Sequence, residues 1–553
     1  MNIIAKIGLL FIIIGTTSCE SFLEEDPNTF ISQTNFYQTE SDARTACDGI
    51  YKLLNDGGAV SLYGRFWPAI DVATDDVSSK VGRTNFNPWF EHTINGEHVW
   101  FESWNQYQGL WSGISRANDV IKFVPEIAMD ADAKNAIIGE AKALRALFYF
   151  HLVRAWGDMP KVVNVGSIED FSKPRSLVDE IYDEIIIPDL MFAENVCVDD
   201  LHTGRITKWT AKVILADVYQ TRAGWRRTSQ GDFTQGNAEY WTLARDKAKE
   251  IIDNSPHVLN TTPLVDGQNM TPAYGVAWSQ SSPFSIESML ELASVNETGN
   301  GNWITRECGP WFNGQQFWGA GVNKPLLSEG INLNVNQLKF PVVVAVGMFI
   351  PTPDLWNAFE PGDQRRDWSL MTRYTTPSGD NYLCQPTFRK YVDIDFYLGA
   401  DNTSFRNTTN NPILYRLADA KLIYAESANE ADGGPSAEAY TQINSIRNRA
   451  GLPDLAGLSQ SDFRTAVWKE RRLEFNAECK RKFDLVRTNR LTTETASIEV
   501  DWTTDNGSVN NYSNHNSLFT GTVVWPDNEW LMPIPQSQIE LNIENEWVQN
   551  EGY

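Results

Sequence analysis

Apolar residues recur every three or four positions in several long stretches of the chain, a spacing that places them on one face of an α-helix. The clearest stretch is 104–124, in which five large apolar residues share a face: Trp104, Tyr107, Trp111, Ile114 and Ile121. A second begins near Ile137 and is ended by Gly157 and Pro160. Further helices are predicted at 178–195, 207–226, 238–254, 412–431, 436–450 and 461–490. Because only short breaks separate many of them, we expect tetratricopeptide-like helix pairs, although no strict repeat period is present.

Two long stretches, 56–103 and 255–410, lack the helical period and are rich in Gly, Asn, Pro, Ser and aromatic residues. Loops of this length are uncommon in a compact domain unless they carry function. The predicted fold is therefore mainly α: a scaffold of tetratricopeptide-like helix pairs with long irregular loop regions and a few short strands. No linker divides the chain, so we expect one domain over 19–553, made of a helical part (19–260), an irregular ligand-binding insertion (261–410) and a second helical part (411–553).

The first 18 residues have the pattern of a secretory signal peptide. Lys6 precedes the apolar stretch Ile7 to Ile14, which is too short to span a bilayer, and small residues follow it up to Cys19. A cysteine in this place resembles a bacterial lipobox, in which the thiol is lipidated and anchors the protein to a membrane. The alternative is a soluble secreted protein in which Cys19 has no such role.

Composition narrows the possible partners. The chain has 553 residues, a formal net charge of -25 and a pI of about 4.7, which disfavour binding to nucleic acid or to an anionic membrane surface. Aromatic residues make up 12% of the chain, with 20 Trp, so a large core can form. The five cysteines after Cys19 are far apart and include no Cys-x-x-Cys, so neither a zinc site nor a redox pair is predicted.

No catalytic constellation is present in the sequence. It has no Gly-x-Ser-x-Gly, no phosphate-binding Gly-x-x-x-x-Gly-Lys and no His-Glu-x-x-His, so we predict no catalytic residue, no metal and no cofactor. Asp71, Asp75 and Asp76 form a polar cluster, for which capping and loop hydrogen bonds are the favoured interpretation. The charges from Lys469 to Arg487 alternate in sign, which indicates a solvated or internally paired helix face.

Aromatic residues in the irregular stretches give the strongest indication of a ligand. A sugar ring presents a flat C–H face edged with hydroxyls, and it is bound by an aromatic plane beside amide or guanidinium groups. Two stretches supply this mixture, and the predicted ligand-binding residues are Arg83, Asn87, Trp89, Phe90, Trp303, Trp311, Phe312 and Trp318. For each ring, filling the core is the alternative. Trp104 and Trp111, at helical spacing, are predicted to lie in the core.

Short motifs follow one another along nearly the whole chain. They are Cys19–Pro27, Gly49–Tyr51, Arg116–Asn118, Ala141–Ala146, Leu152–Pro160, Tyr415–Ala420, Tyr424–Glu426, Ile446–Leu452 and Glu470–Phe475. In this order they resemble the SusD/RagB family, the surface-exposed nutrient-binding lipoproteins of Bacteroidetes-type bacteria. The chain departs from the family pattern at Cys479, where Glu-Gly-x-Arg has Gly, and at Glu551, where the terminal Gln-Asn-Pro-Gly-Tyr has Pro.

The resemblance implies a SusD-like lipoprotein of the outer membrane, anchored by a lipid on Cys19 and exposed at the cell surface. It further implies a non-enzymatic protein that captures oligo- or polysaccharide and delivers it to a SusC-like TonB-dependent transporter. Alternatives are a RagB-like protein that captures peptides, a surface glycosidase or peptidase, and a purely structural helical scaffold.

Overall fold

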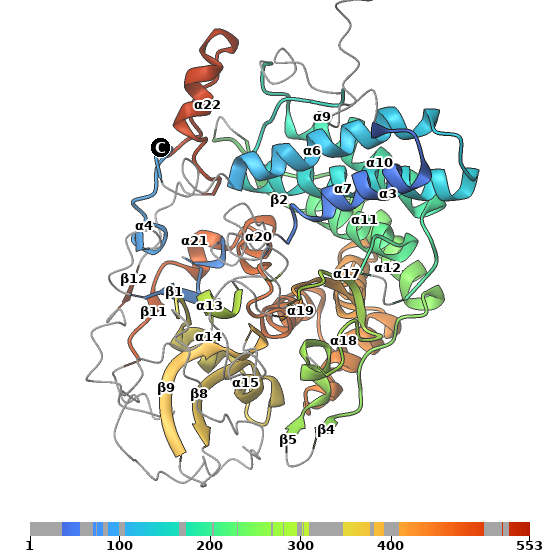
Figure 1. The fold of residues 1–553 in the computed structure, drawn as a ribbon. Helices are drawn as coiled ribbons and strands as arrows, with labels where there is room; N and C mark the ends of the chain where they lie inside the picture. The colour runs from blue at the N-terminus through green and yellow to red at the C-terminus, as the bar shows by residue number, and fades with distance from the viewer. Residues whose placement is uncertain are drawn as a thin grey trace, which may run out of the picture.

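Helices form most of the molecule in the computed structural model (Figure 1). It describes residues 36–55, 63, 70–72, 74–80, 87–98, 106–164, 173–201, 204–228, 231–266, 269–279, 281–295, 301, 304–308, 347–375, 381–391, 409–502, 522–523 and 530–553. Among the helices of this part, none is both long and apolar enough to cross a bilayer.

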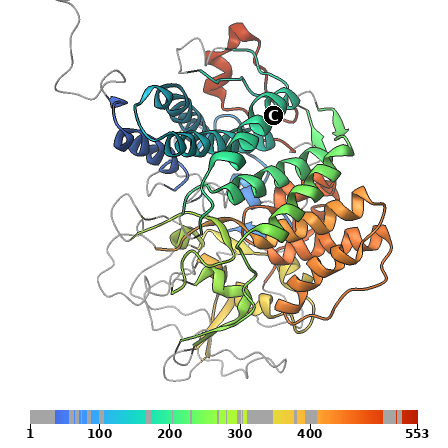
Figure 2. The same cartoon turned by 90° about the vertical axis from the view of Figure 1, so that its right-hand side faces the viewer.

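The N-terminal half folds into helices that pack against one another in sequence order. They are α3 (Glu40–Tyr51), α6 (Gln106–Phe123), α7 (Ala131–Trp156), α9 (Val178–Ile181), α10 (Ile187–Val196), α11 (Lys208–Ala223) and α12 (Glu239–Asn254). A π-helical turn, η5 (Tyr182–Ile186), joins α9 to α10. Figure 2 shows the blue, green and orange helices lying side by side, which confirms the predicted scaffold of helix pairs.

The C-terminal helices continue the scaffold, but two of the predicted boundaries were wrong. The stretch 412–431 begins with a strand, β10 (Ile413–Arg416), before α17 (Leu417–Ala431), and α18 (Ala437–Arg449) follows. The stretch 461–490 is divided between α19 (Gln460–Glu474) and α20 (Arg481–Arg487). The break between them contains Ala477 at φ 59° and Cys479 at φ 61°, a left-handed backbone that cannot continue a helix. This conformation explains why the family pattern has Gly at the position of Cys479.

The middle of the chain is an excursion between two neighbouring helices, because α12 packs directly against α17. Its elements are β4 (Leu264–Asp266), β5 (Asn269–Thr271), η6 (Ala273–Trp278), β6 (Ser288–Glu291), α13 (Ile304–Cys308), β7 (Phe349–Pro351), α14 (Pro353–Ala358), α15 (Gln364–Ser369), β8 (Leu370–Thr375), β9 (Asn381–Phe388) and η8 (Arg389–Tyr391). The described strands of the chain pair only in twos, all antiparallel, which matches the expected few short strands.

Several residues of the motifs quoted above hold the helices of the scaffold together. Arg145 on α7 donates to both oxygens of Asp189 on α10, at 2.7 and 2.9 Å, and to Oδ1 of Asn118 on α6, at 2.7 Å. The indole Nε1 of Trp156 donates to the carbonyl oxygen of Pro533 at 3.0 Å. These buried bonds connect α6, α7, α10 and the C-terminal segment, so these motif residues serve packing rather than chemistry.

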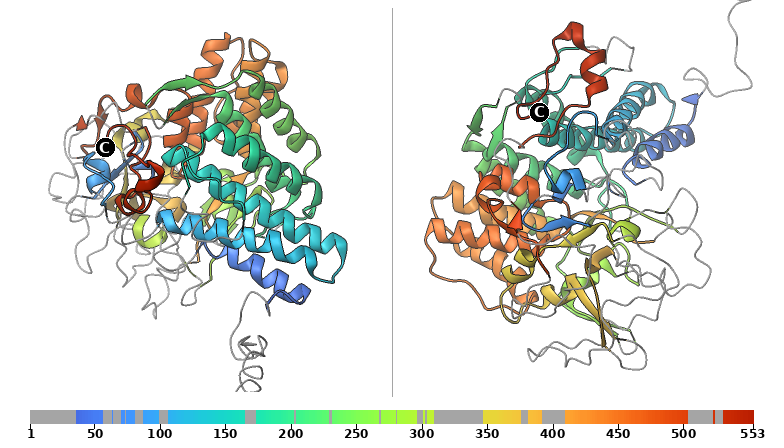
Figure 3. Two further views of the ribbon diagram at one scale, coloured as in Figure 1. Left: turned by 90° about the horizontal axis from the view of Figure 1, so that it is seen from above. Right: turned by 90° about the vertical axis from the view of Figure 1, so that its left-hand side faces the viewer.

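The last part of the chain contacts both the excursion and the helical scaffold, because the Trp502 indole donates to the Pro351 carbonyl oxygen and the Met532 N–H donates to that of Ala155. It contains α21 (Leu491–Glu494), β11 (Ile498–Glu499), β12 (Thr522–Val523), α22 (Gln536–Leu541) and η9 (Ile543–Asn545), with α22 at the edge of the molecule (Figure 3). Near the terminus, Glu551 pairs with Arg227 at 2.8 Å. The residue that departs from the family pattern therefore has an ion-pair partner of its own.

Candidate ligand-binding site

One small sheet joins the two aromatic stretches that the sequence places far apart. Strand β1 (Val77–Ser79) pairs with β7 in an antiparallel register, Val77 opposite Pro351 and Ser79 opposite Phe349. Helix α4 (Asn87–Phe90) packs on β1, and α13 packs on β7. Since Trp303 directly precedes α13 in the sequence, the described flanks of both stretches meet at this sheet. We call α4, β1, β7 and α13 the sheet platform.

The three predicted ligand-binding residues on α4 are buried, and for them the prediction of an exposed ligand surface is not supported. Trp89 and Phe90 are 3% and 1% exposed and belong to the main hydrophobic core. Asn87 uses its amide nitrogen to donate to Ser79 Oγ and to the Lys80 carbonyl oxygen, both at 3.1 Å. A ring enclosed in this way offers no face to a sugar, so these residues fasten α4 to β1.

The remaining predicted residues lie outside the described part of the chain. These are the ligand-binding candidates Arg83, Trp303, Trp311, Phe312 and Trp318, the lipidation candidate Cys19 and the predicted core residue Trp104. Their roles stay predictions.

Asp71, Asp75 and Asp76 connect the sheet platform to the C-terminal helices. Asp75 accepts from Arg481 Nε at 2.8 Å, and Asp76 accepts from Arg472 Nε at 2.6 Å. Burial raises the pKa of Asp71 to about 7; burial also acts on Asp75, but Arg472 and Arg481 outweigh it and lower that pKa to about 2. The three carboxylates are buried, and two of them are paired with guanidinium groups, so they serve as anchors rather than as groups open to substrate.

A buried group of charges that we call the ionic cluster joins the excursion to the C-terminal helices. It consists of five basic and five acidic side chains, each at most 7% exposed: Arg365, Lys390, Arg416, Arg447, Arg449, Glu287, Asp363, Glu470, Glu474 and Glu478. Four come from the excursion between α12 and α17, and six from the segment that begins with β10. The cluster therefore holds the excursion against the helical scaffold. The five positive and five negative formal charges of the cluster balance.

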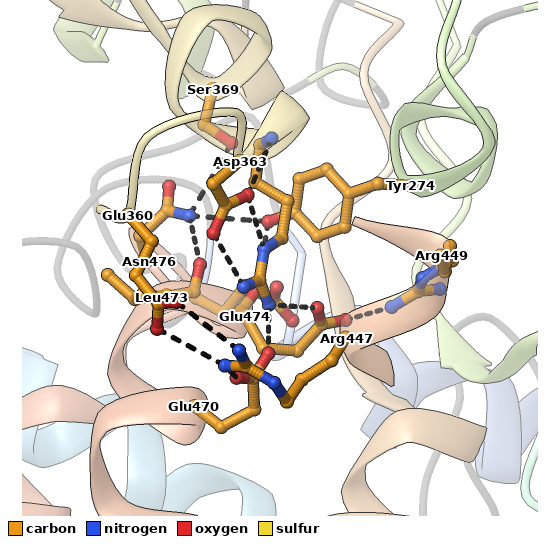
Figure 4. A network of polar contacts seen from close by, with 12 residues as sticks. Tyr274, Glu360, Asp363, Ser369, Arg447, Arg449, Glu470, Leu473, Glu474 and Asn476 are labelled. Carbon is orange, nitrogen blue, oxygen red and sulfur yellow. Dashed lines mark hydrogen bonds and ion pairs between the residues drawn. The ribbon is translucent and has the colours of Figure 1, made fainter. Parts of the chain in front are cut away.

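Glu474 is the centre of the cluster (Figure 4). Its carboxylate accepts from Arg416 Nη1 at 2.5 Å, from Arg365 Nη1 at 3.1 Å and from Arg449. Burial alone raises a carboxyl pKa, but the three guanidinium groups outweigh it and hold the pKa of Glu474 well below its usual range.

Three further contacts belong to the network. Arg365 also binds Asp363 at 2.7 Å and Glu470 at 2.6 Å, and Lys390 Nζ donates to Glu478 at 2.8 Å. Burial lowers the pKa of Lys390 to about 8, although Glu478 opposes the shift.

The alternating charges of 469–487 are thus internally paired, one of the two states expected, and several of them are fully buried rather than solvated. Sequence reasoning missed their partners Arg365 and Lys390, which lie far away in the chain. The motifs at Tyr415–Ala420 and Glu470–Phe475 carried a signal for them, because repeated Arg and Glu beside apolar residues require opposite charges nearby.

A groove of about 530 Å³ lies between α6 and the C-terminal segment. Its rings belong to Tyr107, Trp111 and Trp547, which are 1%, 9% and 6% exposed, and exposed Gln108 and Ser112 lie at its rim. Trp111 is in the core, as predicted. The groove therefore has a polar rim but no open ring face. In the described ranges, no three His, Cys, Asp or Glu residues gather in a way that could hold a metal ion.

Comparison with known proteins identifies the family. Residues 22–220 match the family described as "Starch-binding associating with outer membrane", and residues 288–553 match the "SusD family". The SusD-like protein P25 of Formosa agariphila is 27% identical over 98% of this chain and 97% of its own.

Solved structures agree with this assignment. A SusD superfamily protein from Parabacteroides distasonis has a TM-score of 0.70 and 26% identity, covering 93% of this chain and 99% of its own. Surface glycan-binding protein A from Bacteroides thetaiotaomicron, solved with laminarihexaose, shares the fold with a TM-score of 0.65 and 19% identity, over 93% and 100% of the two chains. Similarity in both halves and over almost the full length confirms the resemblance drawn from the motifs: the chain belongs to the family of SusD-like proteins.

Proposed function

We propose that the protein captures oligo- or polysaccharide at the cell surface and delivers it to a SusC-like TonB-dependent transporter. The observation that carries this proposal is the sheet platform, which brings the flanks of two aromatic, amide-rich stretches together. Family membership supports it, as does the laminarihexaose complex of the structural neighbour.

A binding role without catalysis is the simplest role for this arrangement. A glycosidase requires two carboxyl groups that reach the sugar from opposite sides, at separations of about 5 to 10 Å. The aspartates beside the platform are buried, and Asp75 and Asp76 are engaged by arginines. These aspartates therefore do not supply the pair of open carboxyl groups that a glycosidase requires.

A neutral ligand suits the charge of the protein. The net charge of -25 repels polyanions in general, whereas a neutral glycan is unaffected by it. Binding of such a ligand rests on ring stacking and on hydrogen bonds to hydroxyl groups, for which Trp303, Trp311, Phe312 and Trp318 remain the predicted residues.

Screening the mature chain, without residues 1–18, on glycan and peptide arrays tests the ligand class. We expect saturable binding to one or more neutral glycans and no binding to peptides. Selective capture of peptides would favour the RagB-like alternative, and new reducing ends released from a polysaccharide would favour a glycosidase.

Anchoring and delivery are tested in the native membrane. If the thiol of Cys19 carries a lipid, Cys19→Ala removes the anchor, and the protein moves to the soluble periplasmic fraction. Purification of the native form in mild detergent is expected to recover a large transporter with it, because the tether raises the effective concentration of the two partners. Recovery of the protein alone in several detergents contradicts the delivery role.

A further inference from the structure

A second hollow, lined by three tryptophans, lies on the helical scaffold and shares no residue with the sheet platform. Its volume is about 300 Å³. Trp241 comes from α12, Trp468 from α19 and Trp225 from a hairpin formed by β2 (Trp225–Arg227) and β3 (Phe233–Gln235). All three rings are half-buried, in contrast to the enclosed rings of Trp89 and Phe90. Rings of this kind, converging from three elements, form the walls of a recess rather than a core.

One wall consists of two parallel contacts between α17 and α19. Arg464 Nε donates to Oε1 of Glu430 at 2.7 Å, and Trp468 Nε1 donates to Oε1 of Glu426 at 2.9 Å. The second contact lies one helical turn later on α19 and one turn earlier on α17. The second contact fixes the plane of the Trp468 ring. Arg464 and Glu430 keep 31% and 13% of their side chains exposed, so their polar atoms remain within reach of a ligand.

The opposite wall is the β2–β3 hairpin. Trp225 stacks on Phe233 with ring centroids 5.0 Å apart and planes at 13°, and Phe233 meets Trp530 edge to face. The hairpin approaches α20 closely, because a Cβ atom at Gly224 would lie 2.5 Å from the carbonyl oxygen of Arg487. The Trp225 ring is thus braced on Phe233, and Gln235 lies exposed at the mouth of the hollow.

The charges around the hollow cancel in pairs. Arg487 donates to both oxygens of Glu426, at 2.7 and 2.9 Å, and Arg464 pairs with Glu430. Burial raises the pKa of Glu426, but Arg487 outweighs it, so this carboxylate stays ionised and the pair stays intact at neutral pH. A recess without net charge, with aromatic faces and paired hydrogen-bonding groups, selects a neutral ligand that has both flat apolar faces and hydroxyl groups.

From this geometry we infer that the hollow formed by Trp225, Trp241 and Trp468 is a second binding site for glycan, which accepts one or two neutral sugar units. Its volume is at the lower end of the range for small-ligand pockets, which sets this limit on size. The inference rests on the proposed function in one respect, the ligand class. It adds a second point of contact for glycan, on the helical scaffold.

Calorimetric titration of the mature chain with neutral hexasaccharides (laminari-, cello-, malto-, xylo- and mannohexaose) tests this site. Trp241→Ala is the main variant, and Gln235→Ala is a milder one at the exposed mouth. Tyr240→Ala is the matched control, because Tyr240 is adjacent on α12 but stacks on Tyr219 and lies under Arg222, outside the hollow. The melting temperature of each variant is measured in parallel.

We expect the best hexasaccharide to bind Trp241→Ala about fivefold to tenfold more weakly, or with one site fewer, whereas Tyr240→Ala keeps wild-type binding. If Trp241→Ala fails to fold, a loss of at least twofold in Gln235→Ala carries the same conclusion. Unchanged binding in the folded variants overturns the second site and leaves the proposed function standing. Failure of the wild-type protein to bind every hexasaccharide overturns both.

Discussion

Replacing Glu474 with Gln tests the role of the ionic cluster most sharply. The substitution keeps the shape of the side chain but removes one of five buried acidic charges, so five basic groups face four acids. Arg365, Arg416 and Arg449 each lose their charged partner on this residue. Removing one member of a buried ion pair typically costs about 3 to 5 kcal/mol, because the remaining charge stays buried. We expect a loss in that range.

Glu360→Gln is the matched control. Glu360 pairs with Arg447 at 3.2 Å at the edge of the same network, but 32% of its side chain is exposed. Exposed pairs contribute at most about 1 kcal/mol, so the same chemical change is expected to cost little here.

Urea unfolding of both variants, followed by tryptophan emission and by circular dichroism, gives the two losses in free energy. The slope of the unfolding free energy against urea shows whether the compared states remain the same. If the losses in unfolding free energy for Glu474→Gln and Glu360→Gln differ by less than about 1 kcal/mol, the ionic cluster does not hold the excursion on the scaffold.

Three further predictions concern backbone strain, pH and the ligand surface. Cys479→Gly should be more stable than Cys479→Ala by about 1 kcal/mol in urea unfolding, because only Gly adopts φ 61° without strain; equal stability would show that no strain is stored there. The folded-state pKa of Glu474 lies below the ordinary value of 4.5, because the surrounding arginines outweigh the effect of burial. The free energy that ionised Glu474 contributes to folding is therefore complete above that value and is lost as pH falls below it. The urea midpoint should therefore fall between about pH 5 and pH 3, and less steeply in Glu474→Gln; parallel slopes would contradict this. Trp303→Ala should weaken glycan binding several-fold with little change in melting temperature. Trp89→Ala should instead cost about 3 to 5 kcal/mol of stability, because the ring of Trp89 is 3% exposed. The reverse pattern would exchange the roles of the two residues.

The helical scaffold was predictable because its signal is local. The periodicity around Trp111 and from Ile137 to Gly157 predicted α6 and α7 with few errors. A helix is defined by contacts within four residues, so a short window of sequence contains most of the necessary information. The break at Cys479 escaped prediction because apolar and charged residues on both sides continue the helical pattern, and only the backbone angle interrupts it.

The ligand surface was less predictable, since it depends on contacts between distant segments. Composition placed Trp89 in an aromatic, amide-rich stretch, but burial is decided by the pairing of β1 with β7, which no local window contains. The hollow on the scaffold was missed for the same reason: Trp225, Trp241 and Trp468 belong to three separate elements and meet only in the fold.

Under the proposed function, the protein binds a neutral glycan and leaves it intact. Calorimetric titration of the mature chain with the best glycan from the array tests both parts in one measurement, because binding and hydrolysis give different heat signals. We expect the heat flow to return to baseline after each injection and the isotherm to saturate. A sustained heat flow accompanied by new reducing ends, or the absence of heat with every glycan tested, would contradict it.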